Sequence, residues 1–168
     1  MLKIGSVKLE NRVVAAPLAG ITDRAFRTIL QSMGCGLVFT EMVSDMGLLY
    51  NSNKSRQIAE PGEEEGPVAV QIFGSDPGAM AQAAHMVEKM GADIIDINIG
   101  CPTPKIVRNG EGAALMLEPE LSRKIIRSVV TAVQVPVTVK MRKGWDDERC
   151  NYLQMADIAV SEGVRAIT

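Results

Sequence analysis

The chain alternates short apolar runs with amphipathic stretches from one end to the other. Apolar runs bounded by Gly, Pro or polar residues are typical of buried strands, and apolar residues spaced three and four apart indicate helices. We therefore predict strands over 12–18, 37–42, 68–73, 94–99, 137–141 and 164–168. Helices are predicted over 22–33, 76–90, 119–133 and 146–162, with short helical turns within 44–60. Thr22 and either Ser75 or Asp76 are the expected N-caps.

This alternation indicates parallel βα units, because strand starts lie roughly 25–40 residues apart. It fits either a TIM (β/α)₈ barrel or a doubly wound sheet. No Gly-x-Gly-x-x-Gly follows a predicted strand, which disfavours the dinucleotide-binding form of the latter. Small or polar residues alternate with valine in 68–73 and 137–141, which predicts one tight polar face and favours the barrel. Such a barrel takes about 250 residues, so we expect residues 1–168 to form only its N-terminal five to six βα units.

Composition excludes several classes of protein. The chain is 46% hydrophobic and 23% charged, as is normal for a globular protein. Its net charge of −2 gives no global basic field. We find no run of about 18 apolar residues that could cross a membrane, and no signal-peptide pattern at the N-terminus. Cys35, Cys101 and Cys150 form no close pair, which predicts a reduced, cytoplasmic setting with neither a disulfide framework nor a metal site.

The stretch from Ile94 to Pro104 is the strongest candidate for chemistry. A buried strand here carries Asp96 and Asn98, then turns sharply through Gly100 and Pro102 with Cys101 between them. Polar groups and a thiol at the carboxyl end of a parallel strand indicate an active site. Asp96 lies deeper, and we interpret it as a core carboxylate with satisfied hydrogen bonds.

Two more polar residues end neighbouring strands. Pro67–Gln71 and Pro136–Lys140 share one template, which places Gln71 and Lys140 at equivalent heights, near Asn98 and Cys101. The alternative is that both side chains only reach water. A thiol of ordinary pKa, about 8.5, is mostly protonated at neutral pH, so Cys101 suits a proton donor better than a nucleophile. His85 falls within a helix and is interpreted as structural.

Basic residues gather at the same end of the predicted barrel and suit a phosphate backbone. They are Arg24, Lys105, Arg108, Lys140, Arg142 and Lys143. Acidic residues at 146–148 also lie there, so a mixed solvated rim is the alternative. The acidic run over 63–65 precedes a strand and is predicted to be solvated surface at the opposite end.

At these residues the chain resembles the tRNA-dihydrouridine synthases, most closely the bacterial B-type enzymes. The matching motifs, in family order, are Ala-Pro-Leu-Ala-Gly-Ile-Thr-Asp-Arg-Ala-Phe-Arg from residue 16, Thr-Glu-Met-Val-Ser from 40, Gln-Ile-Phe-Gly-Ser from 71, Asp-Ile-Asn-Ile-Gly-Cys-Pro from 96 and Val-Lys-Met-Arg-Lys-Gly-Trp from 139. The resemblance implies a TIM barrel that carries FMN, takes electrons from NADPH and reduces uridine in tRNA to dihydrouridine.

The resemblance also implies roles for individual residues. Pro17, Leu18 and Ala19 would contact FMN, with Gln71 and Lys140 holding its ring system, Asn98 lying where the uracil enters, and Cys101 donating the proton. From the basic rim, Lys105, Arg108 and Arg142 are expected to bind substrate. In the family, a His-Gly-Arg-type segment, glycine-rich phosphate loops and a helical tRNA-binding domain follow the position of Thr168. Two alternatives are a dihydroorotate-dehydrogenase-like enzyme acting on a free pyrimidine and an inactive fragment that binds RNA or a partner.

Overall fold

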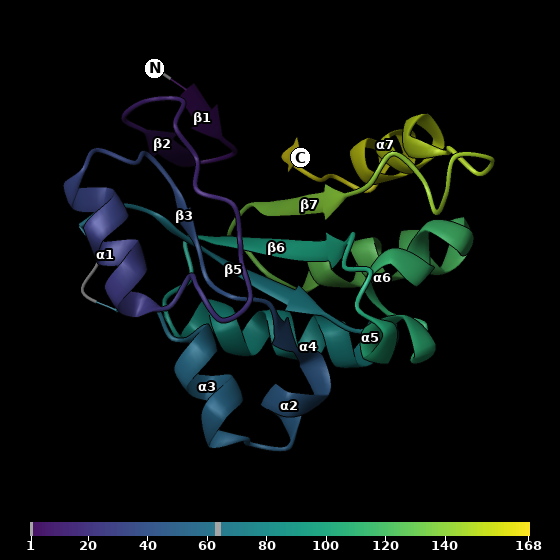
Figure 1. Ribbon diagram of the computed structural model, residues 1–168, viewed down its shortest axis with the longest axis horizontal. Coiled ribbons are helices and arrows are strands. Elements are labelled where there is room, and N and C mark those ends of the chain that lie inside the picture. The colour runs from purple at the N-terminus through teal and green to yellow at the C-terminus, as the bar shows by residue number, and fades with distance from the viewer. Residues whose placement is uncertain (1, 63–64) are drawn as a thin grey trace.

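A parallel sheet organises the computed structural model, which describes residues 2–62 and 65–168. Its strands are β3 (Val38–Phe39), β5 (Val68–Phe73), β6 (Ile94–Ile99), β7 (Val137–Met141) and β8 (Ala166–Ile167), hydrogen-bonded in that order, and β4 (Val43–Ser44) also pairs with β5 (Figure 1). An isolated parallel bridge adds Val14 beside Leu37. The order of the strands across the sheet follows the chain and never reverses. A barrel has such an order, whereas a doubly wound sheet reverses its strand order. The chain therefore forms a half-barrel of parallel strands.

Helices cover the outer face of this sheet. The longest are α4 (Pro77–Lys89), α6 (Pro119–Ala132) and α7 (Tyr152–Ser161); Figure 1 shows α4 running below β5. The remaining ones are α1 (Arg24–Ser32), α2 (Asp45–Leu49), α3 (Asn53–Ala59), α5 (Pro104–Arg108) and the 3₁₀ helix η1 (Gly112–Leu117). Asp76 caps α4 by accepting the Ala79 N–H at 2.7 Å, and Pro77 occupies its first turn.

The two faces of the central strands differ in chemistry. The outer face presents valine and isoleucine, which pack against α4 and α6: Val70, Ile72, Ile95, Ile97 and Val139 against Met80, Ala84, Val87, Ile125 and Val129. Each fully buried side chain of this size contributes about 1.5–3 kcal/mol to folding. The inner face presents Gln71, Asp96, Asn98 and Thr138, all buried as well. Because side chains alternate along a strand, the apolar outer core places these polar residues inside.

The strand register sets the height of each inner side chain. Gln71 pairs with Asp96, and Asp96 with Thr138, so these three form one row across β5, β6 and β7. Asn98 pairs with Lys140 one step nearer the carboxyl ends. The predicted equal height of Gln71 and Lys140 is therefore wrong, because the strands are staggered and equivalent template positions do not stay level.

A hairpin that the sequence analysis did not predict closes the amino ends of the strands. It consists of β1 (Leu2–Ile4) and β2 (Val7–Leu9), paired antiparallel. Leu9 is buried in a small apolar cluster with Leu37, Phe39, Ala69 and Ile94. The opposite, carboxyl end of the barrel interior is thereby left as the end available for a site.

The central elements match the predictions, and the N-terminal ones differ. The strands over 68–73, 94–99 and 137–141 and the helical turns within 44–60 are confirmed, and the helix over 119–133 ends one residue earlier. The strand over 12–18 is reduced to the single bridge at Val14, and that over 37–42 breaks after Phe39, where the Thr40 N–H still bonds Ala69 O at 2.9 Å. The sixth strand is confirmed only at its centre, as β8.

Two helix starts also differ from prediction. Asp23, not Thr22, caps α1, because the Thr22 hydroxyl is engaged with the backbone of Leu18. The helix over 146–162 begins only at Tyr152, because the Asp146 side chain accepts the backbone N–H of Arg149 at 2.8 Å and forms a polar turn instead. Residues 63 and 64 of the acidic run lie outside the described residues, and Glu65 is exposed.

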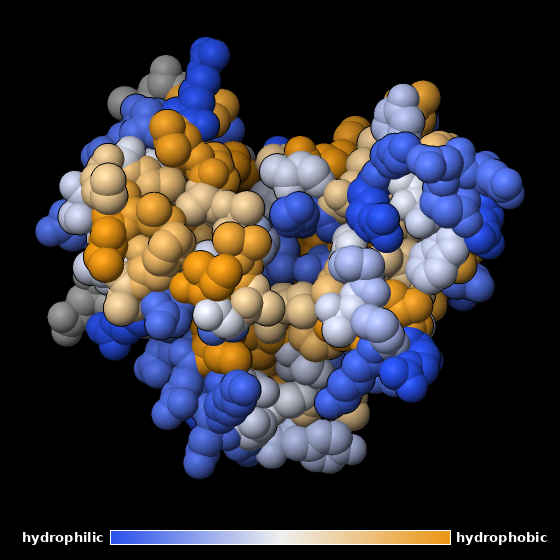
Figure 2. Space-filling model, viewed as in Figure 1, coloured by the Kyte–Doolittle hydropathy of each residue, from blue (hydrophilic) through white to orange (hydrophobic). Residues whose placement is uncertain are grey.

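The helical spacing of α1 is confirmed, but its apolar face is not buried. Phe26, Ile29 and Met33 are exposed, together with Val13 and Ile21 before the helix. The space-filling view shows apolar surface on this side, separated by a hollow from the more hydrophilic side that carries α7 (Figure 2). The hollow opens over the inner face of the sheet.

Candidate active site

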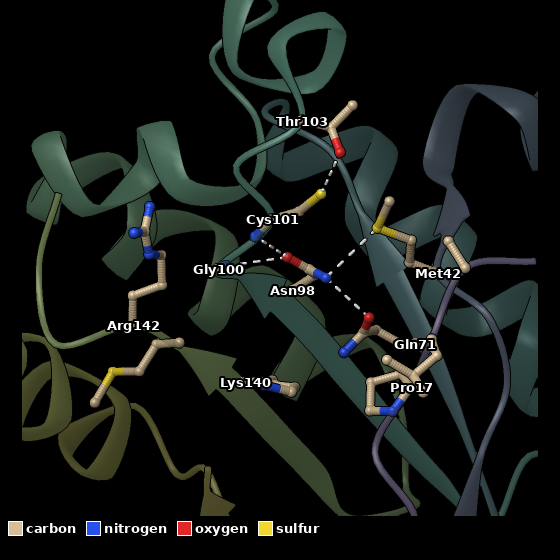
Figure 3. Close-up of a pocket in the computed structure, with 12 residues that line it drawn as sticks. Pro17, Met42, Gln71, Asn98, Gly100, Cys101, Thr103, Lys140 and Arg142 are labelled. Carbon is tan, nitrogen blue, oxygen red and sulfur yellow. Dashed lines mark hydrogen bonds between the residues drawn. The ribbon is translucent and has the colours of Figure 1, made fainter. Parts of the chain in front are cut away.

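A cavity of about 250 Å³ lies at the carboxyl ends of β5, β6 and β7. Its walls come from five parts of the sequence that the half-barrel brings together (Figure 3). They are Pro17, Leu18, Ala19, Met42, Gln71, Asn98, Gly100, Cys101, Thr103, Lys140, Met141 and Arg142. Pro17 to Ala19 and Met42 supply an apolar wall, and the strand-end amides and Lys140 supply a polar one.

Asn98 shapes the turn that carries Cys101. Its Oδ1 accepts the backbone N–H groups of Gly100 at 3.0 Å and Cys101 at 2.9 Å (Figure 3). On the other side of the loop, the Ala113 N–H donates to the Cys101 carbonyl at 2.9 Å. Cys101 is thus held from both sides on a loop that the sequence places directly after a rigid buried strand.

The Cys101 thiol is half-buried at the mouth of the cavity. Its Sγ lies 3.2 Å from the Thr103 hydroxyl, which is exposed (Figure 3). A thiol with a hydroxyl neighbour and open access can give up a proton and regain one from solvent. The sequence prediction that Cys101 lies above Asn98 at this end of the barrel is confirmed in its placement.

Asp96 lies beneath the cavity as a buried carboxylate with partners, as predicted. It is 1% exposed and accepts hydrogen bonds at 2.6 Å from both Gln71 Nε2 and Thr138 Oγ1. Burial raises the pKa of Asp96 to about 6, against the opposing effect of these two hydrogen bonds and of the Lys140 ammonium.

The first βα loop is tied down by two side chains. Thr22 Oγ1 lies 3.1 Å from both the N–H and the carbonyl oxygen of Leu18, and the Gly20 N–H donates to the Glu41 carboxylate. These contacts hold residues 17–19 against the mouth of the cavity. Sequence reasoning missed the tethering role of Glu41, although Glu41 lies in one of the motifs quoted above.

The structure gathers most, but not all, of the predicted site residues. Pro17, Leu18, Ala19, Gln71, Asn98, Cys101, Lys140 and Arg142 all line the cavity. Figure 3 shows the Arg142 guanidinium turned away from Asn98. Lys105 and Arg108 are exposed on α5 and do not line it. The sequence predictions did not include Met42, Thr103 and Met141, which also line the cavity. Thr103 could have been found from its position two residues after Cys101.

Part of the positive charge on the rim of the cavity is neutralised by ion pairs. Lys143 Nζ lies 2.6 Å from Asp147, and Arg149 pairs with Asp146. The acidic residues at this end therefore pair with some of the basic ones and leave others exposed. Within the described part of the chain, no group of three or more His, Cys, Asp or Glu side chains is arranged to hold a metal ion. None of the described helices is both long and apolar enough to cross a bilayer.

A family model described as "Dihydrouridine synthase (Dus)" matches residues 13–168, which include every part of this site. The chain belongs to the dihydrouridine synthase family. It is 47% identical over 167 residues to tRNA-dihydrouridine synthase B of Salmonella typhimurium, covering 99% of this chain and 52% of that one. Identity to the enzyme of the same name in Escherichia coli is 46%, with the same coverage. The probable tRNA-dihydrouridine synthase of Rickettsia conorii is 43% identical, over 100% of this chain and 51% of its own.

The chain spans about half the length of these curated relatives. Among solved structures, a variant of the carboxyl transferase domain of Rhizobium etli pyruvate carboxylase with pyruvate is similar, with a TM-score of 0.58 and 17% identity, over 92% of this chain and 26% of that one. The related structure of the same domain gives a TM-score of 0.55 and 18% identity, over 84% and 22%. These two likenesses show the fold alone.

The lining of the cavity can be compared with the flavin that membership of the family implies. A flavin ring has an apolar dimethylbenzene edge and a polar pyrimidine edge, and the cavity has one wall of each kind. Gln71 keeps one amide N–H beyond the one that it donates to Asp96. Lys140 also lines the cavity, and its ammonium is near enough to Asp96 to oppose the rise in the pKa of that carboxyl.

Proposed function

We propose that this chain forms the N-terminal part of the FMN-binding catalytic barrel of a tRNA-dihydrouridine synthase. The whole protein would reduce uridine in tRNA to 5,6-dihydrouridine in the cytoplasm, with NADPH as reductant. One observation carries the proposal: Cys101 is held by Asn98 at the mouth of a cavity with an apolar and a polar wall, in a chain of this family. The names of the relatives supply the reaction and the substrate.

The reaction adds one hydride and one proton across the C5=C6 bond of uracil. When bound, reduced FMN supplies the hydride for C6. Cys101 supplies the proton for C5 from its Sγ–H, and its thiolate regains a proton from solvent through the exposed Thr103 hydroxyl 3.2 Å away. The two hydrogen atoms and two electrons of the reduction are thereby accounted for.

The remaining wall residues bind and orient. Pro17, Leu18 and Ala19 would pack against the ring system, held there by the tethered first loop. Gln71 would hydrogen-bond the pyrimidine edge. The Lys140 ammonium would face the same edge and stabilise negative charge on the reduced ring.

Contacts with tRNA would come from the rim. Asn98 would meet the uracil, which must leave its stack to enter the cavity. Lys105, Arg108 and Arg142 are exposed near the mouth and would bind the phosphate backbone. These contacts would be strongly salt-dependent, because phosphate binding releases counterions.

We further propose that the half-barrel is completed to eight strands in the longer protein. The described parallel sheet has six strands and open edges at Val14 and β8. Apolar side chains on α1 are exposed beside one of these edges. A closed (β/α)₈ barrel buries both edges and commonly binds phosphate groups after its seventh and eighth strands. A helical tRNA-binding domain would then follow the barrel.

The test is Cys101→Ala in the whole protein, with Cys150→Ala as the matched control. Cys150 is exposed, and its Sγ contacts only the turn at Asp146 and Asp147 among the described residues. We expect FMN binding and NADPH oxidation to persist in both variants. Dihydrouridine formed in an unmodified tRNA transcript should fall by about 10²-fold or more in Cys101→Ala alone, which is the usual effect of losing a general acid. A normal yield in Cys101→Ala would show that this thiol is not the proton donor.

A further inference from the structure

A continuous chain of hydrogen bonds runs from the buried row up to the Cys101 loop. At its lower end, Asp96 Oδ1 accepts from Thr138 Oγ1 and Asp96 Oδ2 accepts from Gln71 Nε2, both at 2.6 Å. Gln71 Oε1 then accepts from Asn98 Nδ2 at 2.8 Å. At the upper end, Asn98 Oδ1 accepts the Cys101 N–H at 2.9 Å. Side chains of three strands thereby connect to one backbone turn.

The two ends of this chain have opposite and fixed hydrogen-bonding character. An ionised carboxylate can only accept, and a backbone N–H can only donate. Gln71 and Asn98 lie between them, and each amide could in principle be turned by 180°, exchanging its oxygen and nitrogen. Only one arrangement satisfies both ends: each amide nitrogen faces Asp96 and each amide oxygen faces the Cys101 turn. Turning either amide alone would set N–H against N–H or oxygen against oxygen.

We propose that Asp96 is a positioning residue that determines which way round the Gln71 and Asn98 amides face the cavity. Through Asn98 it also supports the turn that holds Cys101. Its consequence for ligand binding rests on the proposed function, because the amide groups left over at Gln71 are those that would meet FMN. A buried carboxylate costs free energy, and an acceptor-only group is what this row requires. Asn or Gln at this position could either donate or accept a hydrogen bond. The orientation of the Gln71 and Asn98 amides would then be undetermined unless a neighbouring group specified it.

Thr138 is the neighbour that makes Asp96→Asn a conservative change. The Thr138 hydroxyl donates to Asp96 in the native chain, but it can accept equally well. Asn at position 96 can therefore donate to Thr138 and keep its oxygen toward Gln71. Leu at position 96 has a similar shape and can do neither. The two substitutions separate hydrogen-bond direction from packing.

The first experiment is a double-mutant cycle in the longer protein that contains this half-barrel, read by thermal unfolding. Asn98→Asp places acceptors on both sides of the Gln71 amide, and we expect it to lower the unfolding midpoint by roughly 5–10 °C, as for other disrupted buried networks. Adding Asp96→Asn should regain at least half of that loss, because the new Asn can turn its nitrogen toward Gln71 and reverse the whole row. If the two changes are additive, Asp96 does not set the amide direction.

A control separates direction from charge repulsion. Asp96→Leu with Asn98→Asp removes the same negative charge but gives Gln71 no hydrogen-bond donor. We expect it to remain below the Asp96→Asn, Asn98→Asp pair in unfolding midpoint. Equal midpoints would assign the rescue to charge alone and overturn the proposal. Should Asn98→Asp fail to fold by itself, recovery of a cooperative transition in the Asn pair, and its absence in the Leu pair, is the supporting result.

The second experiment measures FMN binding to the longer protein proposed above by fluorescence titration, because the loops after strands seven and eight would also bind the cofactor. Asp96→Asn should keep the native dissociation constant within about threefold, and Asp96→Leu should weaken it by about tenfold or more, since one misdirected hydrogen bond is worth about that factor. Equal weakening by both variants would mean that Asp96 acts through its charge or through packing. If the longer protein binds no FMN, the proposed function fails, while the unfolding cycle still decides the role of Asp96.

Discussion

Replacing Asp96 by Asn should remove a loss of stability that the native chain undergoes as pH rises. Burial raises the pKa of Asp96 from 3.8 to about 6, against weaker opposing effects from Thr138, Gln71 and Lys140. Between these two values the native chain therefore binds more protons than the unfolded chain. The contribution of Asp96 to the unfolding free energy must therefore fall as pH rises through this window and level off above about pH 6.

The magnitude follows from the same two pKa values. A rise from 3.8 to about 6 corresponds to about 3 kcal/mol of unfolding free energy lost when the carboxyl ionises. Stability is highest with the proton present, below pH 4, and this contribution is gone by about pH 7. Asn cannot ionise, so the variant should lack this slope. The unfolding free energy of Asp96→Asn minus that of the native chain should thus increase by up to about 3 kcal/mol from pH 4 to pH 7.

The assay is urea unfolding of both proteins at half-unit intervals between pH 4 and pH 8. Taking the difference between them cancels the contributions of the other titrating groups. Asp93→Asn is the matched control, because Asp93 is an exposed carboxylate on the same chain segment that accepts the Val68 N–H at 2.9 Å outside the cavity. Parallel pH profiles for Asp96→Asn and the native chain would refute the raised pKa, and with it the view that burial dominates at this site.

Two further predictions concern the Cys101 loop and one residue of the cavity wall. Gly112→Ala should destabilise the chain by roughly 1–3 kcal/mol and more than Gly110→Ala: both glycines have positive φ, but only at Gly112 would a Cβ lie 2.7 Å from the Cys101 carbonyl oxygen. Urea unfolding of the two variants tests this, and equal losses would show that the Cys101 loop can yield. Lys140→Gln should weaken FMN binding and slow flavin reduction by NADPH, measured by titration and stopped-flow absorbance, because it removes the ammonium beside the proposed pyrimidine edge. Unchanged affinity together with unchanged reduction would place Lys140 away from the flavin.

Much of the half-barrel can be read from local sequence. The strands over 68–73, 94–99 and 137–141 are continuous apolar runs with clear boundaries, and Pro77 and Pro119 start helices in their first turns. Those signals are short-range, so they survive without knowledge of the fold. The prediction of a strand over 12–18 was wrong because a strand depends on long-range pairing. The segment's apolar residues indicate a strand, but strand geometry requires a partner along its length, and the fold supplies one only at Leu37.

The candidate site likewise has some features that the sequence indicates and others that only the tertiary structure decides. The sequence by itself determined that Asn98 and Cys101 would share one turn, because they lie three positions apart on a strand-to-loop junction. It also indicated that Asp96 would be buried with partners. Which partners those are was decided by the stagger between β5, β6 and β7, which places Gln71 and Thr138, and not Lys140, level with Asp96. Register is a property of paired strands, so no single strand sequence contains it.

The direction of the amides could be assigned only from the assembled structure. Gln71 and Asn98 each carry both a donor and an acceptor, so neither residue specifies its own orientation. The carboxylate of Asp96 at one end and the Cys101 N–H at the other end specify it jointly, and these two groups reach the amides only through the sheet register and the turn. The sequence thus determined the chemical groups that the site contains. The tertiary structure decided which of their donors and acceptors remain free to meet a ligand.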